Sequence, residues 1–368
     1  MQNTQQQCTK CVMDTTDPDI RFDAQGVCNY CLEAAIVLPK MKFTAEQEQE
    51  NLAKIKQMVH SDANKYDCVI GLSGGVDSSY VALLAHKLGL KALCVHFDNG
   101  WNSEIAVSNI KKIVQKCNYD LATYVIDWPE FKDLQRSFFK AGVVDIEMLT
   151  DHAIMATMFQ LRKKYKLKYI LSGSNYVTEH GMPLKWIWRK QDLTNIRDIQ
   201  SKFGTKKIKN FPTMNSVKFQ LSKLFGLGGT YIEILNGVNY SKVDAMEALK
   251  REFGWEYYGG KHYESVFTKF YQAYILPTKF KFDKRKVHLS AQIRNGEITR
   301  DEALQELAKD IYDPIQLKND RQYVLKKLGF SEEEFGAMMA APPKQHLDYA
   351  SDEWIFNIWR KLKGKKNA

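Results

Sequence analysis

The stretch "YDCVIGLSGGVDSSYVALLAHKLG", from Tyr66 to Gly89, decides how this chain folds. An apolar run is followed by a burst of glycine and serine and then by an apolar-periodic segment, an order that predicts a strand, a loop and a helix. Such a loop is typical of a phosphate site. The lysine of the G-x-x-x-x-G-K-[ST] motif is missing, however, and Asp77 stands inside the loop. A carboxylate repels phosphate unless a divalent cation lies between them, so Asp77 predicts bound Mg²⁺.

The loop residues themselves suit an anion. Gly74 and Gly75 let backbone N–H groups turn inward, and the hydroxyls of Ser73, Ser78 and Ser79 add donors. The helix that follows directs the positive end of its dipole at the same place. The alternative interpretation is a plain glycine-rich turn that begins a helix.

Apolar segments alternate with helical patterns from residue 66 to about residue 200. This alternation predicts an α/β fold with a doubly wound parallel sheet. The expected strands cover 68–72, 91–97, 121–126 and 168–175. Ligands of such sheets bind at the carboxyl ends of the strands, so segments 73–79, 98–101 and 172–175 should converge on one crevice.

The chain divides into four predicted regions. Residues 1–39 form a zinc-binding module, 40–65 a linker helix, 66–200 the sheet domain, and 201–368 a mostly helical C-terminal region. Within this last region the segment 215–236 also has a helical pattern.

Four cysteines fall in two C-x-x-C pairs near the N-terminus, Cys8 with Cys11 and Cys28 with Cys31, separated by sixteen residues. This spacing predicts a four-thiolate zinc site. An iron–sulfur cluster and a chance pattern are the alternatives. A closed site with four cysteine ligands has no open coordination position, so its role is structural or a docking surface.

The bulk composition is that of a globular protein, with 44% hydrophobic and 26% charged residues among 368. No apolar run approaches a membrane span and no signal-peptide pattern opens the chain, so we expect a cytoplasmic protein with no membrane partner. The net charge of +10 predicts either a solvated basic surface or one that attracts anionic ligands. The remaining cysteines are expected to be small buried hydrophobic residues: Cys68, Cys94 and Cys117.

The loop "LSGGVDSS" resembles the pyrophosphate loop of the N-type ATP pyrophosphatases (PP-loop, adenine nucleotide alpha hydrolase-like proteins), which include GMP, NAD and asparagine synthetases. The resemblance implies that a substrate oxygen attacks the α-phosphorus of ATP and that pyrophosphate leaves into the loop. Phe97 would line the adenine, and Asp98 would hold a ribose hydroxyl or a second Mg²⁺, unless it only forms a D-N-G turn. Gly173 and Asn175 would close on the nucleotide.

Further motifs reduce the set of families that the chain resembles: the cysteine pairs, "HFDNGW", "SGSNYVTEHGMP" and the segment 255–304. Together they resemble the N-acetyl sugar amidotransferase family of bacterial lipopolysaccharide and nonulosonic acid biosynthesis. The resemblance implies an ATP-dependent carbon–nitrogen ligase. It would adenylate an acetamido group of a nucleotide-activated N-acetyl sugar, and ammonia would displace AMP to give an acetamidino sugar.

The ammonia needs a source. The chain has no G-x-C-x-G motif and no cysteine at position 2, so a separate glutaminase subunit is expected if glutamine is the donor. The resemblance implies glutaminase and cyclase-like barrel partners similar to those of imidazole glycerol phosphate synthase.

Other residues are candidates for the chemistry of the acceptor. Lys261 would neutralise the adenylation transition state and His262 would carry a proton, or both belong to an ordinary structured loop. Glu264, Lys185 and Arg189 are the predicted acceptor ligands. Nearby residues have bland alternatives: a helix cap at 151–152, core aromatic residues at 186 and 188, and a solvated basic surface at 283–288.

The main rival is a tRNA thiolation or modification enzyme that uses the same adenylating loop. Such enzymes usually carry paired or clustered cysteines inside the catalytic domain, and this chain has none with C-x-x-C spacing there, so a nucleic-acid partner is not expected. A non-catalytic zinc-ribbon protein is a further alternative, disfavoured by the intact S-G-G-x-D-S.

Overall fold

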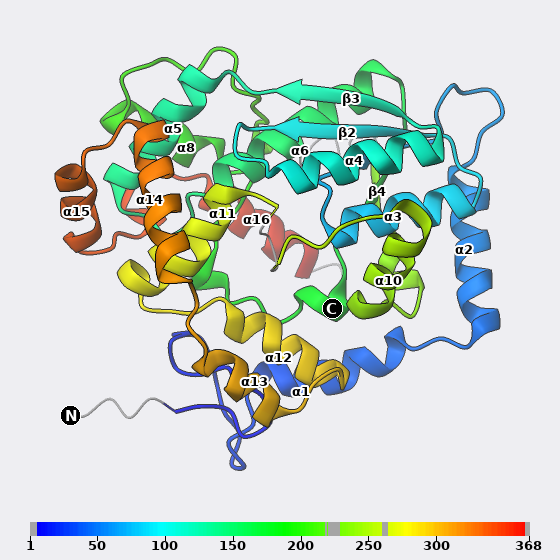
Figure 1. The fold of residues 1–368 in the computed structure, drawn as a ribbon, viewed down its shortest axis with the longest axis horizontal. Helices are drawn as coiled ribbons and strands as arrows, with labels where there is room; N and C mark the ends of the chain where they lie inside the picture. The colour runs from blue at the N-terminus through cyan, green and yellow to red at the C-terminus, as the bar shows by residue number, and fades with distance from the viewer. Residues whose placement is uncertain (1–5, 218, 220–228, 260–263, 365–368) are drawn as a thin grey trace.

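The computed structural model describes residues 6–217, 219, 229–259 and 264–364. A five-stranded sheet lies at its centre, with strand order β3-β2-β1-β4-β5 and every neighbouring pair parallel (Figure 1). The strands are β1 (Cys68–Gly71), β2 (Ala92–Asp98), β3 (Asp120–Val125), β4 (Tyr169–Ser172) and β5 (Thr230–Glu233). The predicted α/β fold with a parallel sheet is confirmed.

The edge strand β5 corrects one prediction. The sequence pattern of 215–236 predicted helix, but residues 230–233 are extended and pair with β4, Ile170 opposite Tyr231. Aromatic and β-branched residues such as Tyr231 and Ile232 fit a pleated surface, and pairing with an existing strand overrides a weak helical pattern. The C-terminal region therefore contributes a strand to the sheet as well as helices.

Helices cover both faces of the sheet. One face carries α3 (Val76–Lys87), α4 (Glu104–Cys117) and α10 (Lys242–Phe253), whose apolar sides share one buried cluster. The other face is covered by α6 (Met148–Lys164), where Met158 packs with strand residues. Parallel strands buried on two sides are near-continuous in apolar residues, which is why β1 and most of β2 are buried.

Local sequence signals set the helix ends. The α5 helix (Trp128–Ala141) begins after Asp127, whose side chain accepts from the Glu130 N–H at 3.1 Å, with proline in the first turn. It ends at Gly142, which takes a left-handed conformation. The same face of the molecule holds α8 (Leu193–Phe203), which packs along α5.

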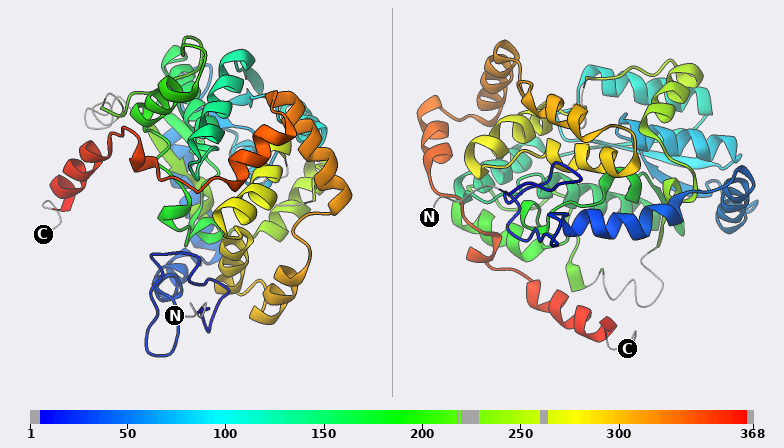
Figure 2. Two further views of the ribbon diagram at one scale, coloured as in Figure 1. Left: turned by 90° about the vertical axis from the view of Figure 1, so that its left-hand side faces the viewer. Right: turned by 90° about the horizontal axis from the view of Figure 1, so that it is seen from below.

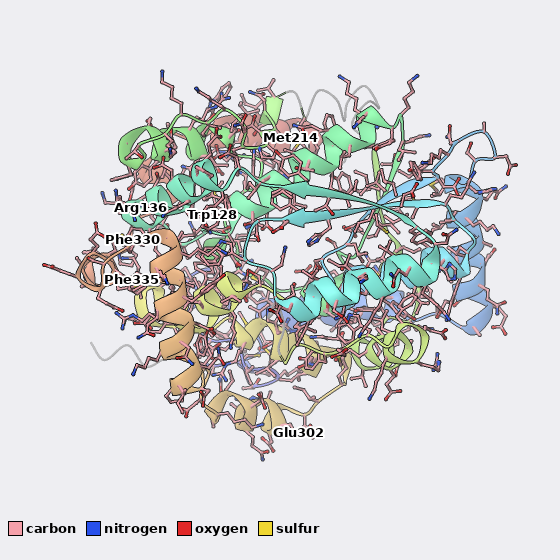
Figure 3. All side chains as sticks on the ribbon, turned by 45° about the horizontal axis from the view of Figure 1, so that its top comes forward. Trp128, Arg136, Met214, Glu302, Phe330 and Phe335 are labelled. Carbon is pink, nitrogen blue, oxygen red and sulfur yellow. The ribbon has the colours of Figure 1, made fainter. Side chains whose placement is uncertain are left out.

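The C-terminal region is mostly helical, as predicted. Its helices are α11 (Val266–Phe270), the π-helical continuation η4 (Tyr271–Phe280), α12 (Arg285–Asn295), α13 (Arg300–Ala308), α14 (Pro314–Leu328), α15 (Glu332–Ala340) and α16 (Glu353–Gly364). The α14–α15 corner packs on α5, where the Arg136 guanidinium lies 4.2 Å from the centre of the Phe330 ring (Figure 3).

The N-terminal part contains α1 (Asn29–Val37), the short helix η1 (Leu38–Met41) and α2 (Ala45–Val59), which a capping box of Thr44 and Gln47 begins. The remaining short helices are α7 (Tyr176–Glu179), η2 (Leu184–Trp186), η3 (Ile234–Gly237) and η5 (His346–Asp348). The segment up to α1 runs beside α12 (Figure 2), whereas α2 contacts η3. In the described part of the chain, we find no helix with the length and apolar character needed to cross a bilayer.

Candidate functional site

The glycine–serine loop joins β1 to α3 in a fixed shape. Gly74 has a φ of +81°, and a Cβ there would lie 2.4 Å from the backbone oxygen of Ala106, so only glycine fits. The hydroxyls of Ser73 and Ser78 lie 3.0 Å apart, and the Gly75 N–H donates to the Ser73 hydroxyl at 3.2 Å. The loop is therefore organised by its own side chains before any ligand binds.

Neighbouring side chains hold the loop from behind. The indole N–H of Trp255 donates to the Gly74 carbonyl at 2.9 Å. This contact occupies a carbonyl oxygen that would otherwise repel an anion in the loop. Ser79, a predicted phosphate ligand, is fully buried in the first turn of α3 and packs behind the loop.

Asp77 lies at the second position of α3, as the sequence predicts, and is half-buried. The Tyr240 hydroxyl donates to one of its carboxylate oxygens, Oδ1. Burial and the Asp77 charge both raise the pKa of Tyr240, so the phenol stays protonated and remains a donor. The second carboxylate oxygen has no hydrogen-bond partner among the described residues, a donor set that fits a divalent cation bridging to phosphate.

The loop after β4 packs closely against the backbone at the start of α3. A Cβ on Gly173 would lie 3.1 Å from the carbonyl carbon of Asp77 and 3.2 Å from the Ser78 nitrogen. Asn175, a predicted ATP ligand, is 2% exposed; it caps α7 by accepting from the Thr178 N–H at 2.8 Å and donates to the Gly173 carbonyl at 3.1 Å. The two strand-end segments do converge, with Asn175 shaping the loop.

A cavity of about 330 Å³ opens at the carboxyl ends of β1 and β2; we name it the sheet-end cavity. The loop and strand ends line one side, α6 a second, and the segment around α11, η4 and the start of α12 a third. Its lining includes Gly71, Ser73, His96, Phe97, Asp151, Met158, Glu264, Thr268, Gln272 and Lys284. This is the crevice that the strand-end prediction requires.

The end of β2 places an aromatic ring and a closed turn at the cavity. Phe97 lines the cavity and stacks on Tyr124, with ring centres 5.5 Å apart and planes 3° apart. Asp98 accepts from the Gly100 N–H at 2.8 Å and from the Asn102 amide at 3.4 Å, which is the D-N-G turn of the alternative interpretation. Burial lowers the pKa of His96, so a neutral imidazole lines this wall.

The Glu264 side chain lies next to the glycine–serine loop. Its carboxylate oxygen would lie 3.5 Å from a Cβ on Gly75, and its carbonyl accepts from the Ser103 N–H at 2.8 Å. The predicted acceptor ligand thus contacts the phosphate-loop side of the cavity. Lys261 and His262 lie outside the described residues.

Lys185 and Arg189 do not line the sheet-end cavity. Lys185 is exposed in η2, and Arg189 pairs with Asp352 at 2.7 Å and with Asp192 and Glu353 at 3.2 Å each. The guanidinium is occupied in joining α8 to α16, so we leave both residues out of the proposed site.

Core aromatic residues at 186 and 188 are confirmed, whereas the helix cap at 151–152 is wrong, because α6 begins at Met148 and the Asp151 carboxylate pairs with Lys190 at 3.1 Å. Trp186 stacks on Phe282 and Trp188 on His346, with ring centres 4.1 and 4.9 Å apart. At the start of α6, His152 is buried and accepts from the Met214 N–H at 3.0 Å, and burial lowers its pKa. These side chains are part of the packed interior.

Three contributors were not found from sequence. Tyr240 precedes α10, Gln272 lies in η4, and Lys284 is the residue just before α12. Only Lys284 had a sequence signal, since it belongs to the basic segment 283–288. The other two reach the site through tertiary packing that no local pattern encodes.

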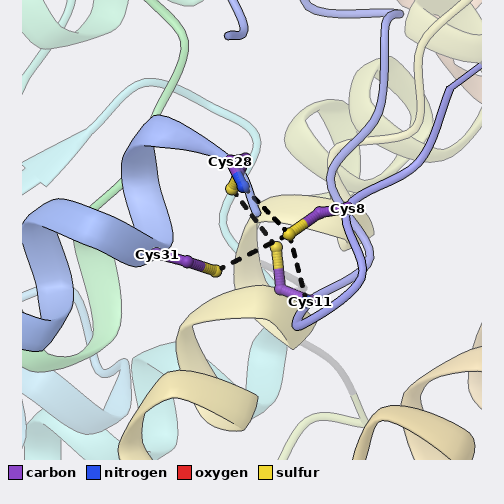
Figure 4. A group of neighbouring side chains, drawn as sticks. All are labelled: Cys8, Cys11, Cys28 and Cys31. Atoms are coloured by element: carbon purple, nitrogen blue, oxygen red, sulfur yellow. Dashed lines mark hydrogen bonds between the residues drawn. The ribbon is translucent and has the colours of Figure 1, made fainter. Parts of the chain in front are cut away.

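The four N-terminal cysteines form a separate buried cluster (Figure 4). The sulfurs of Cys8 and Cys31 lie 3.9 Å apart and those of Cys11 and Cys28 3.7 Å apart. Zinc–sulfur bonds of about 2.3 Å in a tetrahedron require sulfurs roughly 3.8 Å apart, so the residues fit a zinc ion. All four ligand atoms lie within 4.8 Å of one another.

Helices α12 and α13 each direct an arginine at this cluster. The Arg294 guanidinium contacts the sulfurs of Cys31 and Cys11 at 3.4 and 3.5 Å. Arg300 donates to the carbonyls of Cys8 and Cys11 at 3.3 and 3.1 Å. Four thiolates around one zinc carry a net negative charge, which a buried arginine offsets. The N-terminal module is therefore fixed to the C-terminal region.

Two family models match separate parts of the chain. Residues 67–173 match a model described as queuosine biosynthesis protein QueC. Residues 264–363 match one described as LPS biosynthesis protein WbpG-like, C-terminal domain. The first covers the loop, β1 to β4 and the helices between them; the second covers α11 to α16.

Individual proteins match over shorter stretches. The uncharacterized protein MJ1599 of Methanocaldococcus jannaschii is 26% identical over 176 residues, which is 47% of this chain and 61% of that protein. The GMP synthase [glutamine-hydrolyzing] of Aliivibrio salmonicida is 49% identical over 53 residues, 14% of this chain and 10% of that protein. The chain thus spans less than two thirds of these relatives.

Solved structures give weak likenesses. NMN synthetase from Francisella tularensis has a TM-score of 0.32 at 16% identity, over 59% of this chain and 90% of that one. The NH3-dependent NAD synthetase from Campylobacter jejuni has a TM-score of 0.32 at 13% identity, over 81% and 97%. We draw nothing further from these two.

Proposed function

We propose, from the premise that the chain is a PP-loop protein whose C-terminal region belongs to the WbpG-like family, that it is an ATP-dependent carbon–nitrogen ligase. Its substrate would be a nucleotide-activated N-acetyl sugar, and its product the acetamidino sugar, in bacterial surface polysaccharide synthesis. The observation that supports this best is the sheet-end cavity, which the PP-loop and the WbpG-like segment line together. ATP and its acceptor would meet there.

The first half-reaction is adenylation. The acetamido oxygen attacks the α-phosphorus of ATP, the bond to the bridging oxygen breaks, and pyrophosphate leaves toward Ser73, Gly75 and the start of α3. Asp77 would hold Mg²⁺, which neutralises phosphate charge when bound. Tyr240 fixes the Asp77 carboxylate, and Phe97 offers a flat apolar wall to the adenosine.

The second half-reaction forms the carbon–nitrogen bond. Ammonia attacks the activated amide carbon, a proton leaves the nitrogen, and the carbon–oxygen bond to AMP breaks. Ammonia would come from a separate glutaminase subunit working with a cyclase-like barrel subunit. His96 lines the same cavity, but the Leu72 carbonyl and the Asn102 amide occupy its two ring nitrogens at 3.3 Å each, so the proton would pass to solvent or to a second ammonia molecule.

The cysteines disfavour the thiolation alternative. Cys68 and Cys94 are fully buried in β1 and β2, and Cys117 is 5% exposed at the end of α4. Burial raises the pKa of Cys94 and of Cys117 to about 12. Thiols buried in this way are poor nucleophiles and poor sulfur carriers.

Turnover with defined acceptors tests the proposal. The protein is incubated with ATP, Mg²⁺, ammonium and single UDP- or CMP-linked N-acetyl sugars. We expect AMP, pyrophosphate and a product lighter than its acceptor by the difference between an oxygen atom and an NH group. AMP release triggered by bulk tRNA and by no sugar nucleotide would overturn the proposal.

A further inference from the structure

We propose that a second cavity, beside the first, binds the sugar of the acceptor; this inference rests on the proposed function. The cavity has a volume of about 500 Å³ and lies along α12, and we name it the α12 cavity. Most of its lining comes from the WbpG-like segment, including His288, Gln292 and Ile298. Lys242 and Tyr257 complete it from outside that segment.

The two cavities meet at shared residues. Gln272 and Lys284 line both the α12 cavity and the sheet-end cavity. The Gln272 amide donates to the Glu147 carboxylate at 3.0 Å, which anchors the junction to the start of α6. In this proposal, a ligand held in the α12 cavity would extend an arm of a few atoms past these two residues toward the PP-loop.

The lining suits a hydroxyl-rich ligand. Two of its carboxylates pair with cations, Asp283 with Arg285 at 2.8 Å and Glu306 with Lys309 at 2.6 Å. The other two accept hydrogen bonds, Glu302 from the Thr299 N–H at 2.7 Å and Glu297 from the Asn295 amide at 3.3 Å. Each carboxylate keeps lone pairs for sugar hydroxyls. Amide, imidazole and apolar groups complete the mixture that is typical of small-ligand sites.

An aromatic ring stands at the cavity wall. Tyr257 is 48% exposed, and the Lys242 ammonium lies 6.0 Å from its ring centre. A large exposed aromatic residue beside polar groups offers a flat apolar surface on which the C–H face of a sugar ring packs. Gly259, with a φ of +91°, has no atom of the described residues within 4 Å of the position of a Cβ.

Lys284 supplies charge at the junction. It is half-buried at the start of α12, and its ammonium has no ion pair or hydrogen bond within the described ranges. A half-buried unpaired ammonium favours an anion, and the nearest anion in the proposed reaction is the phosphate between adenosine and the activated amide. Lys284 would contact that phosphate, a role that sequence analysis gave to Lys261.

A variant that fills the α12 cavity distinguishes its role from that of the ATP site. In Gln292→Trp the indole would fill the cavity, whereas Gln305→Trp places the same ring on the exposed side of α13 as a control. We expect Gln292→Trp to raise the KM for the sugar nucleotide at least ~10-fold and to change the KM for ATP less than ~2-fold. An unchanged acceptor KM in a variant with wild-type melting temperature would overturn the inference.

Direct binding distinguishes this inference from the function. UDP- and CMP-linked N-acetyl sugars are titrated calorimetrically into wild type and into both tryptophan variants. Wild-type binding that Gln292→Trp abolishes, without AMP formation, would support the cavity and refute the ligase. If the wild type forms AMP and Gln292→Trp forms it equally well, the ligase is supported and the sugar-binding role of the α12 cavity is refuted. If the wild type neither binds a sugar nucleotide nor forms AMP, both the cavity's role and the ligase are refuted.

Lys284 has its own test. Lys284→Gln should lower kcat for AMP formation roughly 100-fold while the Kd for the sugar nucleotide changes little, since the lysine acts on the transition-state charge. Lys111→Gln, an exposed position on α4, is the control. Normal kcat in Lys284→Gln would remove the lysine from the reaction.

Discussion

Tyr240 donates its hydroxyl to the Asp77 carboxylate across 163 residues of sequence. The contact joins the segment before α10 to the first turn of α3. It sets the direction in which the carboxylate presents its other oxygen. The loop thus depends on a residue outside the strand–loop–helix unit that the sequence motif describes.

Replacing Tyr240 by phenylalanine tests this dependence. A hydrogen bond to a charged group contributes about 1.5–3 kcal/mol, so Tyr240→Phe should lower kcat/KM for AMP formation roughly 10-fold or more. Steady-state AMP release at varied Mg²⁺ measures this loss. Tyr80→Phe, a neighbouring tyrosine whose ring centre lies 5.7 Å from that of Tyr240, should retain activity; equal losses in both variants would argue for packing instead.

Removing the charge of Asp77 should have a larger effect on AMP formation than removing the Tyr240 hydroxyl. Asp77→Asn keeps the shape of the side chain and removes the anion that would hold Mg²⁺, so AMP formation should disappear. Metal analysis should still find the cysteine-bound ion, and Asp301→Asn on the exposed surface of α13 should behave as wild type. Near-normal turnover in Asp77→Asn would rule out the metal-bridging role.

The sequence predicted some features because they are local. The loop, the parallel sheet and the cysteine pairs follow from glycine placement, apolar runs and fixed spacing. The strand β5 was missed because pairing with β4 decides its conformation. Asp98 and Asn175 carry the right residue types, but the structure uses their side chains in a turn and a cap. Tyr240 and Lys284 reach the site only through long-range packing.

The variant Gly74→Ala tests whether the backbone shape of the loop requires glycine. In Gly74→Ala the new Cβ would collide with the Ala106 oxygen at a φ of +81°, so the free energy of unfolding should fall by about 2 kcal/mol or more and ATP binding should be lost. Gly336→Ala in α15 meets nothing within 4 Å and should be neutral or slightly stabilising. Chemical denaturation and ATP titration measure both variants.

The cysteine cluster predicts a metal stoichiometry. Cys8→Ser should lose the bound zinc and lower the melting temperature, because a structural zinc site contributes directly to folding. Cys117→Ser, buried at the end of α4, should keep a full equivalent of zinc. Iron with sulfide in the purified protein would instead identify the cluster as iron–sulfur.

Stability should fall in mild acid. Burial lowers the pKa of His346 to about 4, below the value of roughly 6.5 expected in the unfolded chain. The unfolded chain therefore takes up a proton first as pH falls below about 6.5, and stability declines until about pH 4. The ring uses both nitrogens, accepting from the Asp145 N–H at 3.3 Å and contacting the Asn195 amide oxygen at 2.8 Å.

His346→Gln removes this titration. The variant should lose some stability at pH 7 and show a shallower decline of melting temperature between pH 6.5 and 4. His86→Gln, exposed at the end of α3, should keep the wild-type slope. A wild-type slope in His346→Gln would assign the pH dependence to other groups, among them His180, whose pKa burial also lowers to about 4.

The arginine contacts to the cysteine cluster can form only late in the synthesis of the chain. Arg294 and Cys31 are 263 residues apart, and Arg300 and Cys8 are 292 apart. Helices α12 and α13, which carry these arginines, also border the α12 cavity through His288 and Glu302, and Lys284, just before α12, lines both cavities. The cysteine segment must therefore wait for helices that are made much later in synthesis before it finds these partners. A chain released before α12 would have the PP-loop but neither the α12 cavity nor the arginine contacts of the cysteine cluster.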